Sequence, residues 1–355
     1  MANRVENDGL YLGSQIQKMF DIQTTKTALL NAEEKGLIPK ADRLKRGKAS
    51  YRAWTRDQLP LIGEKLGFLK RPENPTVISV FSLKGGTGKT SMAFQLARTS
   101  ALHNIRTIVI GLDAQESITQ TLNKRAKALS DDAPEPEGLY QILAEGADVI
   151  SCVQKTDLPS LDFIPETIEL SILDHWLKNQ KRKEYIIKER LVNKLLASGK
   201  YDQIIFDCNP AWSDVVNGAL GASDILISPL GADINSFKAA KIFVELLDEF
   251  QEDMKHEFDS FIIIPTMVEN NKLSQTILAR YRVDYGELTT VASVKRSVTI
   301  QEANVLGKSM LEVGFNSPAY PEFVNVLREV NASIVGVEIG VTKKEQESAL
   351  VEQTI

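Results

Sequence analysis

The 355-residue chain contains little cysteine and little histidine, only two and three residues respectively. Cys152 and Cys208 form neither a disulfide framework nor a C-x-x-C metal or redox pair, which fits a reducing cytoplasm. His103, His175 and His256 lie far apart in the sequence and lack metal-ligand spacing. The composition therefore argues against a disulfide scaffold and against a histidine-based metal site.

Long apolar runs are also missing. No run approaches the ~20 residues that a membrane-spanning helix needs, and the N-terminus lacks the basic-then-apolar layout of a secretory signal. Hydrophobic residues make up 43% and charged residues 25% of the chain, as in ordinary globular proteins. The length suits one large and one small domain. We expect a cytoplasmic protein that does not associate with membranes.

The net charge of −5 is unevenly distributed. Residues 38–72 hold ten basic and three acidic residues, a surplus of seven positive charges, so the rest of the chain carries a net −12. This polarity suggests a nucleic-acid-binding module joined to an acidic body. A solvated charged face is the alternative interpretation.

The strongest motif is a glycine-rich loop that follows a predicted buried strand, residues 76–82, and precedes a predicted helix that begins at residue 91. The loop consists of Lys84, Gly85, Gly86, Thr87, Gly88, Lys89 and Thr90. The backbone N–H groups of such a loop converge on phosphate oxygens, and the helix N-terminus adds partial positive charge there. We predict that Lys89 reaches the β- and γ-phosphates of a nucleotide and that the Thr90 hydroxyl binds Mg²⁺.

Short apolar runs alternate with helical stretches after residue 75. The runs are residues 107–112, 161–164, 203–206, 224–227, 261–264 and 290–294, and the helical stretches include 183–197, 235–250 and 272–285. Continuous apolar strands separated by helices predict an α/β fold whose mostly parallel sheet is covered by helices on both faces. We expect this domain at residues 73–338, followed by a polar tail at 339–355.

Two acidic residues follow predicted strands, and ligands of open α/β sheets lie beyond the carboxyl ends of strands. Asp113 ends the second strand of this domain and Asp207 ends a later one. Asp207 looks like a Walker B acid, which would hold Mg²⁺ through water opposite Thr90. An acid in such a place is otherwise often a helix N-cap.

The first 72 residues are predicted to form a separate small domain. Helices are expected at 11–20, 25–35 and 55–66, with a basic hairpin at 38–54 between the last two. Helix, helix, hairpin and helix is the order of elements in a winged helix-turn-helix. Two prolines, Pro72 and Pro75, indicate the boundary to the α/β domain.

The glycine-rich loop has Leu83 where the strict phosphate-loop pattern has glycine, and it has a second lysine, Lys84. This variant resembles the deviant Walker A loop of the ParA/MinD class of ATPases. The resemblance implies an ATP-dependent homodimer in which Lys84 crosses to the nucleotide of the partner subunit. Asp113 resembles the catalytic aspartate of the ParA motif Asp-x-Asp-Pro-Gln, which orients or activates water, although Gly111 and Ala114 depart from that motif.

The likeness extends over residues 76–330. Segments 161–166, 264–267 and 294–308 resemble, in order, the family's Ile-Pro strand, its adenine-side segment and its C-terminal stretch. The resemblance implies catalytic roles for Lys84, Lys89 and Asp113, and ATP and Mg²⁺ as cofactors. It implies nucleotide contacts from residues 84–91, which end at Ser91, and from Pro265, Thr266 and Met267. It implies non-specific DNA contacts from Lys295, Arg296 and Lys308.

The N-terminal region resembles the MerR-type DNA-binding domain through residues 33–39, 46–52 and 54–59. The side chains expected near bases are Thr25, Lys26 and Thr27, and those expected on phosphates are Arg46, Lys48 and Arg52. Together with the ATPase segments, this points to the larger ParA subtype, which carries its own helix-turn-helix.

This resemblance implies ATP-driven segregation of plasmid or chromosomal DNA by a nucleoid-associated protein. The ATP dimer would bind DNA non-specifically, the N-terminal domain would bind an operator for autoregulation, and a ParB-type partner would stimulate hydrolysis. A MinD-like positioning ATPase would want a basic amphipathic C-terminal helix, whereas residues 343–355 hold three acids and two lysines. An iron–sulfur carrier would need a cysteine pair. A MerR-like regulator that uses ATP as a ligand with little turnover stays open, because Gly111 departs from the catalytic motif.

Overall fold

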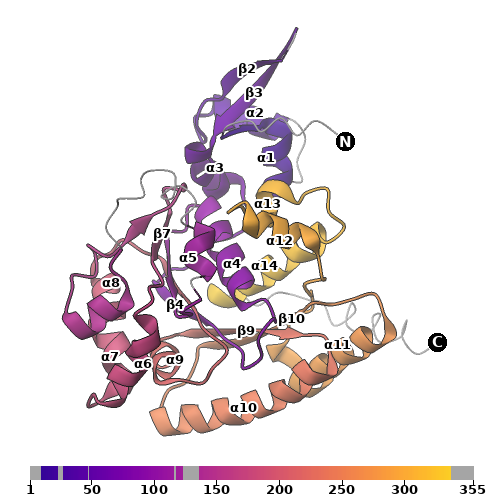
Figure 1. Ribbon diagram of the computed structural model, residues 1–355. Coiled ribbons are helices and arrows are strands. Elements are labelled where there is room, and N and C mark those ends of the chain that lie inside the picture. The colour runs from indigo at the N-terminus through magenta and orange to yellow at the C-terminus, as the bar shows by residue number, and fades with distance from the viewer. Residues whose placement is uncertain (1–8, 23–26, 47, 116, 123–135, 337–355) are drawn as a thin grey trace.

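The computed structural model describes residues 9–22, 27–46, 48–115, 117–122 and 136–336. A seven-stranded sheet forms the centre of the molecule, and helices cover both of its faces (Figure 1). A smaller three-stranded sheet with helices α1, α2 and α3 lies at one end, at the top of Figure 1. The predicted α/β fold with a mostly parallel sheet is confirmed.

Six strands of the central sheet run parallel. In chain order they are β4 (Thr76–Val80), β5 (Thr107–Gly111), β7 (Leu161–Ile164), β8 (Gln203–Asp207), β9 (Ile225–Gly231) and β10 (Ser260–Thr266). The spatial order is β10-β9-β4-β8-β5-β7-β6, and the short β6 (Gln154–Lys155) pairs antiparallel with β7. The loop after β4 and the carboxyl ends of β5 and β8 therefore meet at one edge of the sheet.

Alternate residues of each strand enter two separate cores, because side chains along a strand point to opposite faces. Ile78, Val109 and Ile205 pack on the face that α4 (Lys89–Leu102) and α14 (Tyr320–Ile334) cover. Val77, Ile108 and Ile204 belong to the core on the other face. The helices that contribute to that second core are α6 (Leu170–Lys178), α7 (Lys183–Ile187), α8 (Asn193–Ala197), α9 (Asp214–Leu220) and α10 (Ile234–Met254).

The other α-helices of this domain follow β5 or β10 along the chain. They are α5 (Ser117–Leu122), α11 (Lys272–Tyr285), α12 (Val298–Val305) and α13 (Met310–Val313). Gln141–Glu145 and Lys188–Val192 form π-helical turns, and Gly286–Leu288 forms a 3-10 turn. The π-helical turn at Lys188–Val192 separates α7 from α8, where the sequence predicted one continuous helix.

The N-terminal unit comprises the elements from β1 to α3. These are β1 (Leu10–Leu12), α1 (Gly13–Met19), α2 (Thr27–Glu34), β2 (Asp42–Arg46), β3 (Ala49–Thr55), a 3-10 turn (Arg56–Gln58) and α3 (Leu59–Leu66). Helix, helix, hairpin and helix follow one another in the predicted order, and the hairpin projects away from the body (Figure 1). The predicted helical start at residue 11 was wrong, because Leu10–Leu12 pair with β3 as a third strand.

The N-terminal unit shares one hydrophobic core with the α/β body. Met19, Phe20 and Ile62 belong to the same buried cluster as Leu102 and Leu311. Gly63 of α3 approaches α4 so closely that a β-carbon there would lie 2.0 Å from the carbonyl oxygen of Leu102. Packing is therefore continuous across the boundary predicted near residue 72.

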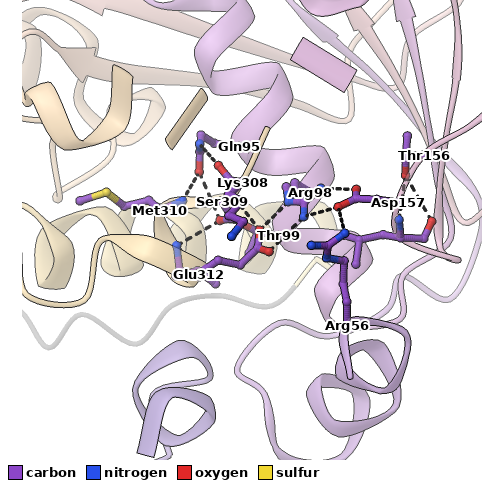
Figure 2. Close-up of polar contacts among 12 residues, drawn as sticks. Arg56, Gln95, Arg98, Thr99, Thr156, Asp157, Lys308, Ser309, Met310 and Glu312 are labelled. Carbon is purple, nitrogen blue, oxygen red and sulfur yellow. Dashed lines mark hydrogen bonds and ion pairs between the residues drawn. The ribbon is translucent and has the colours of Figure 1, made fainter. Parts of the chain in front are cut away.

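A buried polar network joins the same two parts (Figure 2). The guanidinium of Arg98 in α4, whose side chain is 1% exposed, binds Glu312 of α13 and Asp157. Glu312 also accepts a hydrogen bond from the Tyr11 hydroxyl at 2.9 Å, and Asp157 pairs with Arg56 at 2.8 Å. One residue of the phosphate-loop helix thus connects to two segments of the N-terminal unit.

The last predicted strand, residues 290–294, was wrong. Isolated bridges flank this segment, Ile263 with Thr289 and Val268 with Lys295. Within it, the amides of Thr290 and Val294 donate to the carbonyl oxygens of Ile263 and Pro265 in β10, but no continuous ladder forms. Glu329 of α14 accepts hydrogen bonds from the backbone amides of Val291 and Ala292 and so takes donors that a strand ladder would use. The predicted polar tail, residues 339–355, lies outside the described residues. Within the described part of the chain, no helix combines the length and apolarity that crossing a bilayer requires.

Candidate functional site

The predicted phosphate loop connects the buried strand β4 to the N-terminus of α4. Gly86 and Gly88 have φ angles of 75° and 92°, in the left-handed region that glycine adopts without strain. Gly85 and Gly86 are exposed, whereas Thr87 is buried and its hydroxyl lies 2.9 Å from that of Ser82. The loop thus presents exposed backbone on a fixed base.

Lys89 lies beneath this loop. The residue is 7% exposed, and its Nζ donates a hydrogen bond to the Lys84 carbonyl oxygen at 2.9 Å. Burial lowers the pKa of Lys89, and the negative charges of Asp207 and Asp113 act against that decrease. Lys89 therefore stands between the loop and both strand-end acids.

Asp207 is fully buried at the end of β8, and neither of its carboxylate oxygens has a hydrogen-bond partner within the described structure. Burial raises the pKa of Asp207 to about 7, while the Thr90 hydroxyl and the Lys89 charge act in the opposite direction. A buried carboxylate without a partner is costly, and a bound cation would remove that cost.

Asp207 and Thr90 fit a Mg²⁺ ion, which prefers hard oxygen ligands and takes one or two from protein and the rest from phosphate and water. The described residues contain no group of three or more His, Cys, Asp or Glu side chains placed to hold a metal. A metal here would consequently depend on nucleotide oxygens and water for most of its ligands.

Asp113 lies two residues beyond β5 and is half-buried. Its Oδ1 accepts a hydrogen bond from the Gln115 amide at 3.0 Å, which forms a local turn. Gly111 at the end of β5 is the register partner of Asp207. Asp207 thus ends β8, and Asp113 follows the neighbouring strand β5 by two residues.

A third carboxyl group at this edge, Glu166, was missed by the sequence analysis. It follows β7, is 2% exposed, and its side chain fills the space beside Gly111. Burial raises the pKa of Glu166 to about 8, the charge of Asp207 adds to this rise, and backbone hydrogen bonding from Thr119 and Asp113 opposes it. The sequence did contain a signal for this residue. Glu166 directly follows Pro165 at the end of a predicted strand, and the resembled motif has Gly111 where an acid is usual.

Lys84 has partners within its own chain that the sequence did not predict. Its Nζ lies 2.9 Å and 3.1 Å from the two carboxylate oxygens of Asp233 and 2.9 Å from the Ser236 hydroxyl, at the N-terminus of α10. Burial alone would raise the pKa of Asp233, but hydrogen bonds from Ser236 and Lys84 lower it to about 2. This ion pair holds Lys84 against another part of its own chain.

The predicted adenine-side segment lies against the loop. The Thr266 hydroxyl donates to the Thr87 carbonyl oxygen at 2.8 Å, and a β-carbon on Gly88 would lie 3.7 Å from the Met267 methyl group. Ser91, next after the loop, accepts a hydrogen bond from the Asn304 side chain at 2.8 Å. The structure therefore brings residues 84–91, Pro265–Met267, Asp113 and Asp207 to one place.

Comparisons with known proteins agree with this geometry. A family model described as an AAA domain (AAA_31) matches residues 75–260. The chromosome partitioning protein ParA of Caulobacter vibrioides is 25% identical over 256 residues, which cover 72% of this chain and 93% of the relative. The chain belongs to the ParA/Soj-type partition ATPase family.

A second relative and a solved structure are also similar to this chain. The cell division protein PomZ of Myxococcus xanthus is 26% identical over 228 residues, covering 64% of this chain and 69% of the relative. A solved ATP complex of McdA from Cyanothece has a TM-score of 0.63 at 20% identity and covers 76% of this chain and 99% of its own. That structure shares the fold.

The predicted DNA-binding residues of this ParA-type ATPase lie in several places. Thr25 and Lys26 lie outside the described residues, and Thr27 begins α2. Arg46 ends β2, Lys48 is exposed after it, and Arg52 of β3 forms an ion pair with Glu33 at 2.6 Å. Arg52 thus braces the hairpin against α2.

Two of the three predicted DNA contacts of the body have ion-pair partners. Lys295 pairs with Glu322 at 2.8 Å and Arg296 with Glu269 at 3.3 Å, although both cations remain more than half exposed. Lys308 lines a cavity of about 500 Å³ between the N-terminal unit and the body. The residues that line it are Gly9, Leu10, Thr55, Arg56, Asp57, Thr121, Leu122, Asp157, Leu306, Gly307 and Lys308.

Proposed function

We propose that this protein is an ATP-hydrolysing DNA segregation ATPase of the larger ParA subtype, cytoplasmic and nucleoid-associated. Its ATP-bound homodimer binds DNA non-specifically, and a ParB-type partner on a centromere-like site stimulates hydrolysis. The observation that supports this most strongly is the convergence of a two-lysine phosphate loop with the buried, unpartnered Asp207. Family membership adds to it.

Each residue at the loop has a proposed role. Backbone N–H groups from Gly85 to Lys89 bind the phosphates, Lys89 neutralises their charge, and Thr90 and Asp207 hold Mg²⁺ and its water shell. Bound Mg²⁺ supplies charge neutralisation at the transferred phosphoryl group. Asp113 orients the attacking water, and the segment Pro265–Met267 lies against the base.

Lys84 acts across the dimer in this proposal. To reach the nucleotide of the partner subunit it has to leave Asp233 and Ser236, which hold it in its own chain. Exchange of one negatively charged partner, Asp233, for another, the phosphate chain, makes this movement electrostatically feasible. The dimer then forms only when a nucleotide offers that second anion.

We further propose that the N-terminal unit is a winged helix-turn-helix that binds an operator and regulates the protein's own expression. The N-terminus of α2 would enter the major groove, and the β2–β3 hairpin would lie along the backbone. Lys45 and Lys48 are exposed on this hairpin, with Arg43 on the same strand as Lys45. These cations would neutralise phosphates.

The proposed division of roles between the two strand-end acids gives a first prediction. We expect Asp113→Ala to bind ATP with Mg²⁺ and to dimerise, but to hydrolyse ATP at least ~100-fold more slowly, because only water activation is lost. We expect Asp207→Ala to weaken nucleotide binding itself, because the metal shell is lost. Fluorescent-nucleotide titration and steady-state phosphate release separate the two outcomes. Equal loss of ATP affinity in both variants would contradict the assignment.

The hairpin gives a second prediction. In the full chain, Lys45→Ala and Lys48→Ala are each expected to reduce the slope of log K for operator binding against log salt concentration by about one unit. Neither should change the sequence preference. Binding is measured by fluorescence anisotropy across a salt series with promoter and scrambled duplexes. Lys65→Ala is the control, because the Lys65 side chain is exposed on α3 outside the hairpin, and it should leave the slope unchanged. Unchanged slopes in both hairpin variants would contradict the assignment of the hairpin to the DNA backbone.

A regulator that uses ATP only as a ligand is the second candidate. The shared core and the Arg98 network favour it, because they connect the phosphate-loop helix directly to the N-terminal unit. Steady-state ATPase activity with and without DNA and the partner distinguishes the candidates. Turnover at background under all conditions, with operator binding that depends on ATP, would favour the regulator.

A further inference from the structure

The carboxyl end of β5 lacks a side chain at Gly111, directly beside Asp207. The side chain of Glu166 occupies that space. A β-carbon on Gly111 would lie 2.2 Å from Cγ of Glu166 and 2.4 Å from both its Cδ and its Oε1. These distances are far shorter than van der Waals contact, so a side chain at position 111 and Glu166 in its present place exclude each other.

Glu166 ties the end of β7 to the segment that follows Asp113. Its Oε2 accepts hydrogen bonds from the amides of Ile118 at 3.1 Å and Thr119 at 3.2 Å, in the first turn of α5. Its own amide donates to the Thr119 hydroxyl oxygen at 2.7 Å. First-turn amides have no partner within a helix, so an acceptor at this point fixes where the helix begins.

We propose that Glu166 supplies, from the end of β7, the carboxyl group that the ParA-type motif carries at position 111, and that it positions Asp113 for ATP hydrolysis. The inference rests on the proposed hydrolysis. Three hydrogen bonds connect Glu166 to α5, and α5 begins four residues after Asp113. Glu166 contacts α5 and not the proposed reacting atoms, so it would act through Asp113 as a positioning residue.

The substitution pair Gly111→Asp and Glu166→Ala tests this exchange. An aspartate at 111 would start within 2.4 Å of the present carboxyl carbon of Glu166, so its carboxylate can take the same place once Glu166 is truncated. Each single variant is expected to lower kcat by ~10- to 100-fold, the size of effect that small misplacement of a reacting group produces. The KM for ATP should change by less than about threefold. The double variant is expected to recover kcat to within about threefold of wild type.

Hydrogen exchange reports the positioning directly. In Glu166→Ala, peptides covering residues 117–122 should exchange faster, and the double variant should restore their protection. Glu166→Gln keeps an oxygen that can accept from the two amides, so it should retain most activity. If the kcat of the double variant is no higher than the value obtained by multiplying the two single losses, the proposal is overturned. A Glu166→Gln variant as impaired as Glu166→Ala would also overturn it.

Glu329→Ala is the matched control. Glu329 also accepts hydrogen bonds from two backbone amides, Val291 and Ala292, but it lies on α14. Its loss should lower the melting temperature and leave kcat unchanged. If the wild-type protein does not hydrolyse ATP, the proposed function fails. Hydrogen exchange then decides the inference by itself. If the double variant does not restore the protection of residues 117–122 that Glu166→Ala loses, the two carboxyl groups are not interchangeable and the proposal is overturned.

Discussion

Lys84→Ala is expected to abolish ATP-dependent dimerisation and to lower ATP turnover by ~10³-fold or more, while ATP still binds. A positive charge supplied in trans stabilises the transferred phosphoryl group, as an arginine finger does. Lys89, which stays in the loop, retains the charge that nucleotide binding needs. Analytical ultracentrifugation with ATP and ADP, together with phosphate release, measures both effects.

The ion pair of Lys84 with Asp233 requires a control, because Lys84→Ala also breaks a contact within the subunit. Asp233→Asn removes the same ion pair, and its amide oxygen can still cap α10. If Lys84 acts in trans, this variant should dimerise at least as readily as wild type. A variant Asp233→Asn that fails to dimerise, or Lys84→Ala turning over ATP at the wild-type rate as a monomer, would refute the trans role.

The second large effect is expected at Glu312. Glu312→Ala should destabilise the protein by about 3–5 kcal/mol, because it leaves the Arg98 guanidinium buried with only Asp157 as a charged partner. It also removes the acceptor of the Tyr11 hydroxyl and of the Ser309 amide, so the junction between the N-terminal unit and the body loosens. Urea unfolding monitored by tryptophan fluorescence measures the change, since Trp54, one of three tryptophans, is 1% exposed in that unit.

An exposed ion pair provides the comparison. Arg182 and Glu189 lie 3.0 Å apart with side chains 68% and 51% exposed, so Glu189→Ala should cost less than about 1 kcal/mol. Glu312→Gln keeps hydrogen-bonding capacity without the charge and should fall between the two. Equal stability of Glu312→Ala and Glu189→Ala would mean that the buried network does not hold the junction.

Local sequence signals predicted most of the residues that the structure brings together at the candidate nucleotide site. The spacing of glycines and lysines between a buried strand and a helix defined the loop from Lys84 to Thr90, and acids after apolar runs identified Asp113 and Asp207. These signals depend on neighbours along the chain, which is why they were readable. The parallel strands then bring residues nearly a hundred positions apart to one edge, as in the pairing of Gly111 with Asp207.

Contacts between distant segments could not be read in the same way. The pair of Lys84 with Asp233 spans 149 positions and the hydrogen bond of Tyr11 with Glu312 spans 301. Leu10–Leu12 became a strand, and residues 290–294 did not, because the partners available in space decided which backbone groups paired. Local motifs of the chain were enough to predict a phosphate loop and its two acids near strand ends. Only the tertiary structure decided three other features, because each depends on packing between elements that are distant in the sequence. It placed Glu166 in the space beside Gly111, joined the N-terminal unit to the body through one core, and paired Lys84 with Asp233.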